Sequence, residues 1–289
     1  MKPNSYQISA FCLVARHRSF SRAAQALGVT QSSVTQHVGK LERLMEARLF
    51  IRNRDGLVLT PAGADLFQLS DRLKTLEEAV YERVSNYQKL EEGHLKIIAT
   101  APRPSMQLIS TFSAAHPGIH IDFSPENWTN CNEAVKNRTV DMAIFTDPIQ
   151  QKTAIIHVLR KTRYLAYVSK EHYLANRSST SLKELVKETL ILPDSGSLTN
   201  KIVCKALQSE GLALQRSLQM KSFPVVKEAA LHNLGVAILL EDSLHPSPDL
   251  EAIPIVEMQQ THQDCLVLPE EKQNLRLVKR FTEIALSVY

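Results

Sequence analysis

The strongest constraint on this chain is a stretch near its N-terminus, residues 11–63, in which three short apolar segments follow one another at helical spacing. Each segment is too short to be stable alone, because helix nucleation is unfavourable and short isolated helices are marginal in water. The apolar residues at this spacing are Phe11, Val14, Ala15, Ala23, Ala24, Leu27, Val34, Val38, Leu41 and Leu44. The stretch is therefore predicted to fold as three helices packed on one another.

Capping signals separate the second of these helices from the third. Ser19 and Ser21 are placed to cap the free amides at the start of the second helix, and Gly28 is placed to end it in the left-handed conformation. Thr30 is the expected N-cap of the third helix. The turn between the two helices holds only Gly28 and Val29, which fits a helix-turn-helix motif whose second helix enters the DNA major groove.

The third helix carries short polar side chains on the face opposite its apolar residues, with Gln31 near its N-terminus, where base contacts usually arise. In an isolated helix such a face would simply be solvated. Here, two short apolar runs around residues 53–56 follow and predict a hairpin, the wing of a winged helix-turn-helix, in which Arg52 and Arg54 can meet phosphates. The predicted DNA-contacting residues are Ser21, Arg22, Thr30, Gln31, Ser32, Ser33, Thr35, Gln36, Arg52 and Arg54.

Positive charge is concentrated in the same region. Residues 1–60 hold nine lysines and arginines against three acidic residues, a net charge of +6, whereas the whole chain carries only +4. Solvated helices often show such a bias, so the charge alone is weak evidence. Together with the helix pair, it indicates a surface that binds a polyanion.

These residues resemble the DNA-binding domain of LysR-type transcriptional regulators. The matching positions are Ser19-Phe20-Ser21-Arg22-Ala23-Ala24, Leu27-Gly28-Val29-Thr30-Gln31, Leu41-Glu42, Leu49-Phe50, Arg52, Leu59-Thr60 and Ala62-Gly63. The resemblance implies that residues 1–63 bind double-stranded promoter or operator DNA, with RNA polymerase as a further candidate partner. Ser32 replaces a usual proline and Gln36 a frequent arginine at positions that concern base reading, and Met45 replaces a usual glycine.

A single long helix is predicted over the segment that follows, residues 64–92, in which apolar residues recur every three or four positions. This apolar stripe is expected to be buried against another surface, and a second copy of the same helix is the simplest candidate. Packing against the downstream part of the same chain is the alternative. The predicted dimerisation residues are Leu66, Leu69, Leu73, Leu76, Val80, Val84 and Tyr87, and the resemblance favours a homodimer or homotetramer.

Beyond residue 93, short apolar strands alternate with helices, which predicts parallel sheets covered on both faces. The strands are expected at 95–99, 119–123, 142–145, 164–168, 189–192, 218–221, 236–240, 252–256 and 265–268. The helices are expected at 106–115, 130–137, 182–186, 198–210, 225–232 and 271–288. The overall prediction is an α plus α/β chain.

Residues 93–289 resemble the effector-binding domain of the same family, which is built like a periplasmic binding protein. Looser matches support this at Pro117, Val140-Asp141-Met142-Ala143-Ile144, His172-Tyr173-Leu174-Ala175 and Leu234-Gly235-Val236-Ala237. The resemblance implies two lobes, the first at about 93–163 and 262–289 and the second at about 164–261.

A ligand is expected beyond the carboxyl ends of the strands, where helix N-termini offer free amides. Arg103 can bind a carboxylate or phosphonate through two hydrogen bonds, and Trp128 can line the site. Equally good interpretations are that Arg103 is a surface charge and that Trp128 is a packing residue. In the family, Asn233 lies in a loop bordering the cleft and replaces a common glycine. The candidate effector-binding residues are Thr100, Ala101, Arg103, Ser105, Asn127, Trp128, Thr129, Phe145, Thr146, Ser195, Gly196, Ser197 and Asn233.

Other functional classes lack their sequence signals. There is no phosphate loop, dinucleotide fingerprint or nucleophile elbow, so neither an enzyme nor a cofactor is predicted. Cys12, Cys131, Cys204 and Cys265 show no paired spacing for a metal or a disulfide, and a redox role for Cys204 is the weaker reading because it has no nearby partner cysteine. Neither a signal peptide nor a membrane-spanning run is present, so a cytoplasmic location is expected.

The sequence thus predicts a DNA-binding transcriptional regulator controlled by a small, anionic or zwitterionic effector. The alternative within the same class is a regulator with a vestigial cleft, controlled by its abundance or by a protein partner. A two-lobed solute-binding protein or enzyme is the competing class, which the DNA-binding head argues against.

Overall fold

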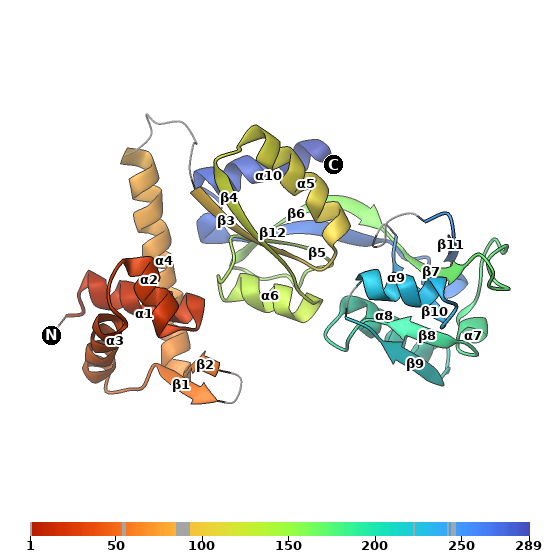
Figure 1. The fold of residues 1–289 in the computed structure, drawn as a ribbon, viewed down its shortest axis with the longest axis horizontal. Coiled ribbons are helices and arrows are strands. Elements are labelled where there is room, and N and C mark those ends of the chain that lie inside the picture. The colour runs from red at the N-terminus through yellow and green to blue at the C-terminus, as the bar shows by residue number, and fades with distance from the viewer. Residues whose placement is uncertain (1, 54–55, 85–92, 222, 242, 244–246) are drawn as a thin grey trace. The chain divides into compact units, whose positions relative to one another are not determined.

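The structure is a computed structural model that describes residues 2–53, 56–84, 93–221, 223–241, 243 and 247–289. The chain divides into two compact units (Figure 1). The first holds the N-terminal helices with a hairpin, and the second holds two five-stranded sheets with their covering helices. The predicted fold class, a helix-turn-helix followed by a long helix and an α/β domain, is confirmed.

The first unit contains three short helices, a two-stranded hairpin and a long helix. These are α1 (Ser5–His17), α2 (Phe20–Leu27), α3 (Gln31–Met45), β1 (Phe50–Asn53), β2 (Gly56–Leu59) and α4 (Pro61–Val84). Phe11, Val34 and Leu41 are among the side chains buried between α1, α2 and α3, as their spacing predicted. The caps are also as expected, since Thr30 accepts a hydrogen bond from the Ser33 amide and Gly28 ends α2 with φ of 66°.

The hairpin and α4 meet at a close backbone approach. The hairpin strands are antiparallel, and their turn at residues 54–55 lies outside the described residues. The Thr60 amide donates to the Leu49 carbonyl at 3.0 Å, so the chain folds back onto the start of the hairpin before α4 begins. A Cβ on Gly63 would lie 2.2 Å from that carbonyl oxygen. Only glycine fits at this position of the first turn of α4.

The first sheet of the second unit has the strand order β4-β3-β5-β12-β6 and is called lobe I here (Figure 1). Its strands are β3 (Gly93–Ala99), β4 (Ile119–Pro125), β5 (Met142–Thr146), β6 (Ala154–Thr162) and β12 (His262–Pro269). Helices α5 (Pro102–Ala115) and α10 (Arg276–Val288) cover one face, and α6 (Trp128–Lys136) covers the other. A short 3₁₀ turn, Glu270–Lys272, precedes α10, which starts five residues later than predicted.

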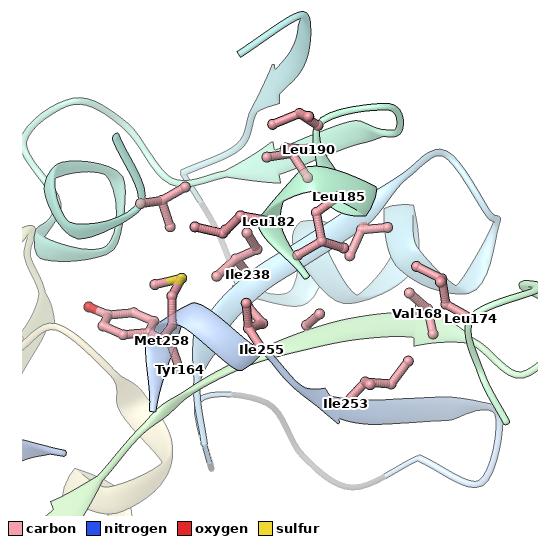
Figure 2. Packing of buried hydrophobic residues seen from close by; sticks show 14 of the residues in the cluster. Tyr164, Val168, Leu174, Leu182, Leu185, Leu190, Ile238, Ile253, Ile255 and Met258 are labelled. Carbon is pink, nitrogen blue, oxygen red and sulfur yellow. The ribbon is translucent and has the colours of Figure 1, made fainter. Parts of the chain in front are cut away.

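The second sheet, lobe II, has the order β11-β7-β10-β8-β9. Its strands are β7 (Tyr164–Ser169), β8 (Thr189–Leu192), β9 (Arg216–Gln219), β10 (Val236–Leu240) and β11 (Leu250–Pro254). Helices α7 (Leu182–Leu185) and α8 (Leu198–Ser209) pack on one face, and α9 (Phe223–Leu231) packs on the other. Figure 2 shows the first of these cores, where Leu182 and Leu185 of α7 meet Ile238 of β10.

The expectation of parallel sheets is wrong in part, because both sheets are mixed. β12 runs antiparallel to β5 and β6, and β7 runs antiparallel to β10 and β11. The physical reason is that the chain passes between the lobes at β6 to β7 and again into β12. A strand that enters a lobe from the other lobe needs no crossover helix, so it can pair antiparallel with its neighbours. β6 itself was not predicted.

Candidate nucleic-acid interface and ligand site

The outward face of α3 carries most of the predicted DNA contacts. Gln31, Ser32, Thr35 and Gln36 are exposed, whereas Val34 on the same helix is fully buried. Two of the polar side chains are already engaged in the helix. The Thr35 hydroxyl donates to the Gln31 carbonyl at 2.9 Å, and Thr30 serves as the N-cap. Gln31 and Gln36 therefore offer the longest reach toward a base edge.

A pocket of about 330 Å³ lies where the α1–α2 turn, the start of α3 and the hairpin meet. It brings together three of the predicted residues, Ser21, Gln31 and Arg52, from three different elements. Its complete lining is Arg18, Ser19, Phe20, Ser21, Gln31, Arg52 and Leu57. Two guanidinium groups and two serines around one hollow suit a phosphate group, to which arginine can donate two hydrogen bonds.

Arg18 was not predicted as a contact residue. It ends α1 in the left-handed conformation with φ of 48°, and it is exposed and lines the pocket. The only sequence signal was its place in the basic run Arg16-His17-Arg18. Of the other predicted residues, Arg22 is exposed on α2, Ser33 is half-buried, and Arg54 lies outside the described residues.

Helix α4 has two different faces. One face is buried against α1 and carries Phe67, Ser70, Asp71 and Thr75, and the Asp71 carboxylate pairs with Arg16 at 2.7 Å. The other face is an exposed apolar stripe, called the α4 stripe here, formed by Leu69, Leu73, Leu76 and Val80.

These four residues are part of the predicted dimerisation set. The other members are placed differently, since Leu66 packs partly against the core of the first unit. The side chain of Val84 and all of Tyr87 lie outside the described residues.

The second unit brings two predicted ligand-site loops into direct contact. One is the start of α6 in lobe I, with Asn127, Trp128 and Thr129, and the other is the turn before α8 in lobe II, with Gly196. The Thr129 hydroxyl donates to the Gly196 carbonyl at 2.9 Å, and the Thr129 amide donates to the same oxygen at 3.2 Å. A Cβ on Gly196 would lie 2.7 Å from the Asn127 side-chain nitrogen, so a larger residue here would push the Asn127 side chain aside.

Lys201 also crosses from lobe II to lobe I, and it was not predicted. Its amino group lies 3.2 Å from the Thr129 hydroxyl and 4.3 Å from the centre of the Trp128 ring. Trp128 is held in lobe I, because its indole N–H donates to the carbonyls of Thr146 and Asp147. The sequence offered no signal for this arrangement beyond the place of Lys201 one turn into α8.

Several of the remaining predicted ligand-site residues have structural roles, as a helix cap, as a hydrogen-bond donor or as buried side chains. Ser197 caps α8 by accepting from the Asn200 amide, and the Thr146 hydroxyl donates to Asp264. The side chains of Ser105 and Phe145 are buried within lobe I. Thr100 and Ala101 follow β3, Arg103 lies half-buried in the first turn of α5, and Ser195 lies in the turn before α8.

Asn233 is not brought to the other candidates. It adopts the left-handed conformation with φ of 55° in the turn between α9 and β10. β8 and β10 are parallel, so the residues before β10 lie at the opposite end of the sheet from the residues after β8. Asn233 and the Ser195 turn are thus at opposite ends of lobe II.

A polar cluster lies where β5 ends and β12 begins, near the strand crossings between the lobes. Asp264 pairs with Arg160 at 2.9 Å, and the Asp147 carboxylate lies 2.5 Å from Nδ1 of His262. Partial burial by itself would raise the pKa of Asp147. Hydrogen bonds from His262 and from the Gln263 amide outweigh it and hold this pKa below its usual value.

Three of the four cysteines are unreactive by burial. Desolvation raises the pKa of Cys12 to about 11 and that of Cys265 to about 12, and it raises the pKa of Cys131 as well. Cys204 is exposed on α8, with its thiol 3.5 Å from the Asn200 side-chain oxygen. Among the described residues, no three His, Cys, Asp or Glu side chains are grouped as a metal site would need, and no helix has both the length and the hydrophobicity to cross a membrane.

Comparison with known families accounts for both units. The family model "Bacterial regulatory helix-turn-helix protein, lysR family" matches residues 6–64. The model "LysR substrate binding domain" matches residues 88–289, which is more than half of the chain.

The chain is also similar to individual relatives, over its full length or over most of it. It is 25% identical over 304 residues to the HTH-type transcriptional regulator MJ0300 of Methanocaldococcus jannaschii, covering 100% of both chains. A full-length OxyR variant from Pseudomonas aeruginosa has a similar fold, with a TM-score of 0.81, 17% identity, and coverage of 99% of this chain and 95% of that one. The Synechocystis CcmR regulatory domain in complex with 2-PG matches with a TM-score of 0.62, 19% identity, and coverage of 68% and 97%.

Proposed function

Because the chain belongs to the LysR family, and is therefore a DNA-binding transcriptional regulator with a substrate-binding domain and not an enzyme, we propose that it recognises one operator sequence through α3 and the adjoining pocket. The observation that carries this proposal is the pocket that joins Ser21 and Gln31 to Arg18 and Arg52. In this proposal the two arginines hold a phosphate and fix the register of the head on the duplex.

Base reading is assigned to the exposed side chains of α3. Gln31, with its amide at the start of the helix, can hydrogen-bond two atoms of one base edge. Ser32 and Gln36, the two positions that depart from the family pattern, then give this protein an operator preference of its own. We assign DNA binding to residues 1–63, dimerisation to 64–92 and effector binding to 93–289.

The α4 stripe supports a homodimer. Its four side chains are large, apolar and exposed on a helix whose opposite face is already buried against α1. Contiguous apolar surface of this kind usually marks an interaction site. A twofold copy of α4 would cover it and present two α3 helices to a site with approximate twofold symmetry, and pairs of dimers would give the tetramer.

The DNA proposal is tested by footprinting full-length protein on the DNA that flanks its own gene. Arg52→Ala should reduce the slope of log affinity against log salt by about 1, because one phosphate contact is lost. Gln31→Ala should lower discrimination against a mutated operator about 5- to 150-fold and leave the salt slope unchanged.

Lys279→Ala, an exposed lysine on α10, removes the same charge outside the head and is the matched control for Arg52→Ala. Equal effects of the two substitutions on the salt slope, or no preference of the wild-type protein for any fragment, would contradict the proposed interface.

The substrate-binding domain is proposed to bind a small anionic effector between the lobes and so modulate operator binding. Support comes from the contact of the two loops at Thr129 and Gly196 and from the Lys201 charge beside them. The CcmR regulatory domain was solved in complex with 2-PG, which makes 2-PG the first compound to test. Titration calorimetry with 2-PG and a panel of carboxylates and neutral sugars tests the charge, and binding of neutral compounds alone would refute it.

A further inference from the structure

The contact between the lobes contains a positive charge without a carboxylate partner. Lys201 is exposed on α8 of lobe II, and within the described part of the chain no Asp or Glu pairs with its amino group. Its neighbours in lobe I are a hydroxyl, Thr129, and an aromatic face, Trp128. An exposed amino group gains less from such neutral partners than from a charge-assisted hydrogen bond to an anion.

Both neutral partners are held in place by hydrogen bonds, Trp128 within lobe I and Thr129 to Gly196 of lobe II. The indole N–H of Trp128 donates to two carbonyls, those of Thr146 at 3.0 Å and Asp147 at 3.2 Å. Thr129 is fixed by its two hydrogen bonds to Gly196. The lysine, on its flexible stem, is therefore the mobile member of the group and the one that can turn toward a ligand.

The position of Lys201 links charge recognition to the contact between the lobes. Its backbone belongs to lobe II, yet its amino group reaches a residue of lobe I that is 72 positions away in sequence. An anion that binds this amino group in place of Thr129 breaks one of the hydrogen bonds between the lobes. Binding and lobe contact are therefore coupled through a single side chain, and by linkage each changes the other to the same extent.

We propose that Lys201 is the specificity-determining residue for the acidic group of the effector. A carboxylate or phosphate that enters beside Asn127 and Gly196 draws the Lys201 amino group away from the Trp128 ring. Trp128 lines this site. Because it is the only tryptophan in the chain, its fluorescence also reports binding there. This inference rests on the proposed effector function, and it adds the residue that selects the charge.

The test is a fluorescence titration of the full-length protein at constant ionic strength. Inorganic phosphate, oxalate and 2-PG are the anionic probes, and glycerol is the neutral one. Each anion that binds at Lys201 should produce a saturable change in Trp128 emission, and glycerol should produce none. The phosphate and oxalate arms show whether a phosphate or a carboxylate is preferred.

Three variants isolate the charge. Lys201→Met keeps a long apolar stem and should weaken anion binding about tenfold or more, because a hydrogen bond to a charged group is lost. Lys201→Arg should keep the response. Lys183→Met, an exposed lysine on α7 of the same lobe, is the matched control and should behave as wild type.

Unchanged anion affinity in Lys201→Met, or no saturable response of the wild type to any of the three anions, would overturn the inference. Operator binding without added anion is measured on the same samples. If DNA is bound and anions have no effect, only the role of Lys201 fails. If no DNA fragment is preferred, the proposed function fails, whatever the fluorescence shows.

Discussion

Truncating one leucine of the α4 stripe should weaken self-association by an amount set by its exposure. Leu76 is 64% exposed, so about two-thirds of its surface is available for burial against a second α4. Burying a whole leucine side chain stabilises by about 1.5–3 kcal/mol, so this share contributes about 1–2 kcal/mol per copy. A twofold interface contains the residue twice, so Leu76→Ala should cost about 2–4 kcal/mol of dimerisation free energy.

This cost corresponds to a rise of about 30- to 700-fold in the dissociation constant of the dimer. Sedimentation velocity over a concentration series measures that constant for the wild type and the variant. Leu286→Ala is the control, because Leu286 is also an exposed leucine, 48% exposed, but lies on α10. An unchanged constant in Leu76→Ala, or an equal shift in Leu286→Ala, would refute the assignment of the stripe to the dimer interface.

Three further predictions concern the described contacts. Asp71→Ala removes the buried carboxylate that pairs with Arg16 and should lower the stability of the first unit by about 3 kcal/mol, measured as an earlier urea transition. An unaltered transition would mean that the pair contributes nothing. The lowered pKa of Asp147 means that its stabilising effect is full above about pH 4 and is lost as the pH falls through the folded-state pKa. Asp147→Asn should therefore flatten the acid side of the profile of thermal stability against pH. A profile parallel to that of the wild type would exclude this role. A thiol reagent at neutral pH should label one cysteine per native chain, Cys204, and four after unfolding, which mass spectrometry of the labelled peptides checks.

The head could be read from the sequence because its signals are local. A cap such as Thr30, the left-handed Gly28 and the apolar spacing of α3 each act within a few residues, and the structure shows all three as predicted. The position of Gln31 at the start of an exposed polar helix face followed from the same signals. The pocket did not, because Arg18 and Arg52 come together only when the α1–α2 turn packs beside the hairpin.

The α/β part was predicted by element but not by strand direction. Periodicity locates a strand, whereas its direction depends on which neighbour it pairs with, and β7 and β12 pair antiparallel with strands far along the chain. β6 was missed because its exposed and half-buried residues include charged ones, so it lacks the continuous apolar run of a central strand.

The sequence by itself determined the helix-turn-helix head, the apolar stripe that follows it and the family to which they point, because helical periodicity and capping are written in neighbouring residues. Only the tertiary structure decided that Thr129 meets Gly196, 67 residues away, and that Lys201 covers the ring of Trp128. The physical reason is that such contacts depend on how two different sheets of one unit meet, and no local pattern of side chains encodes that geometry.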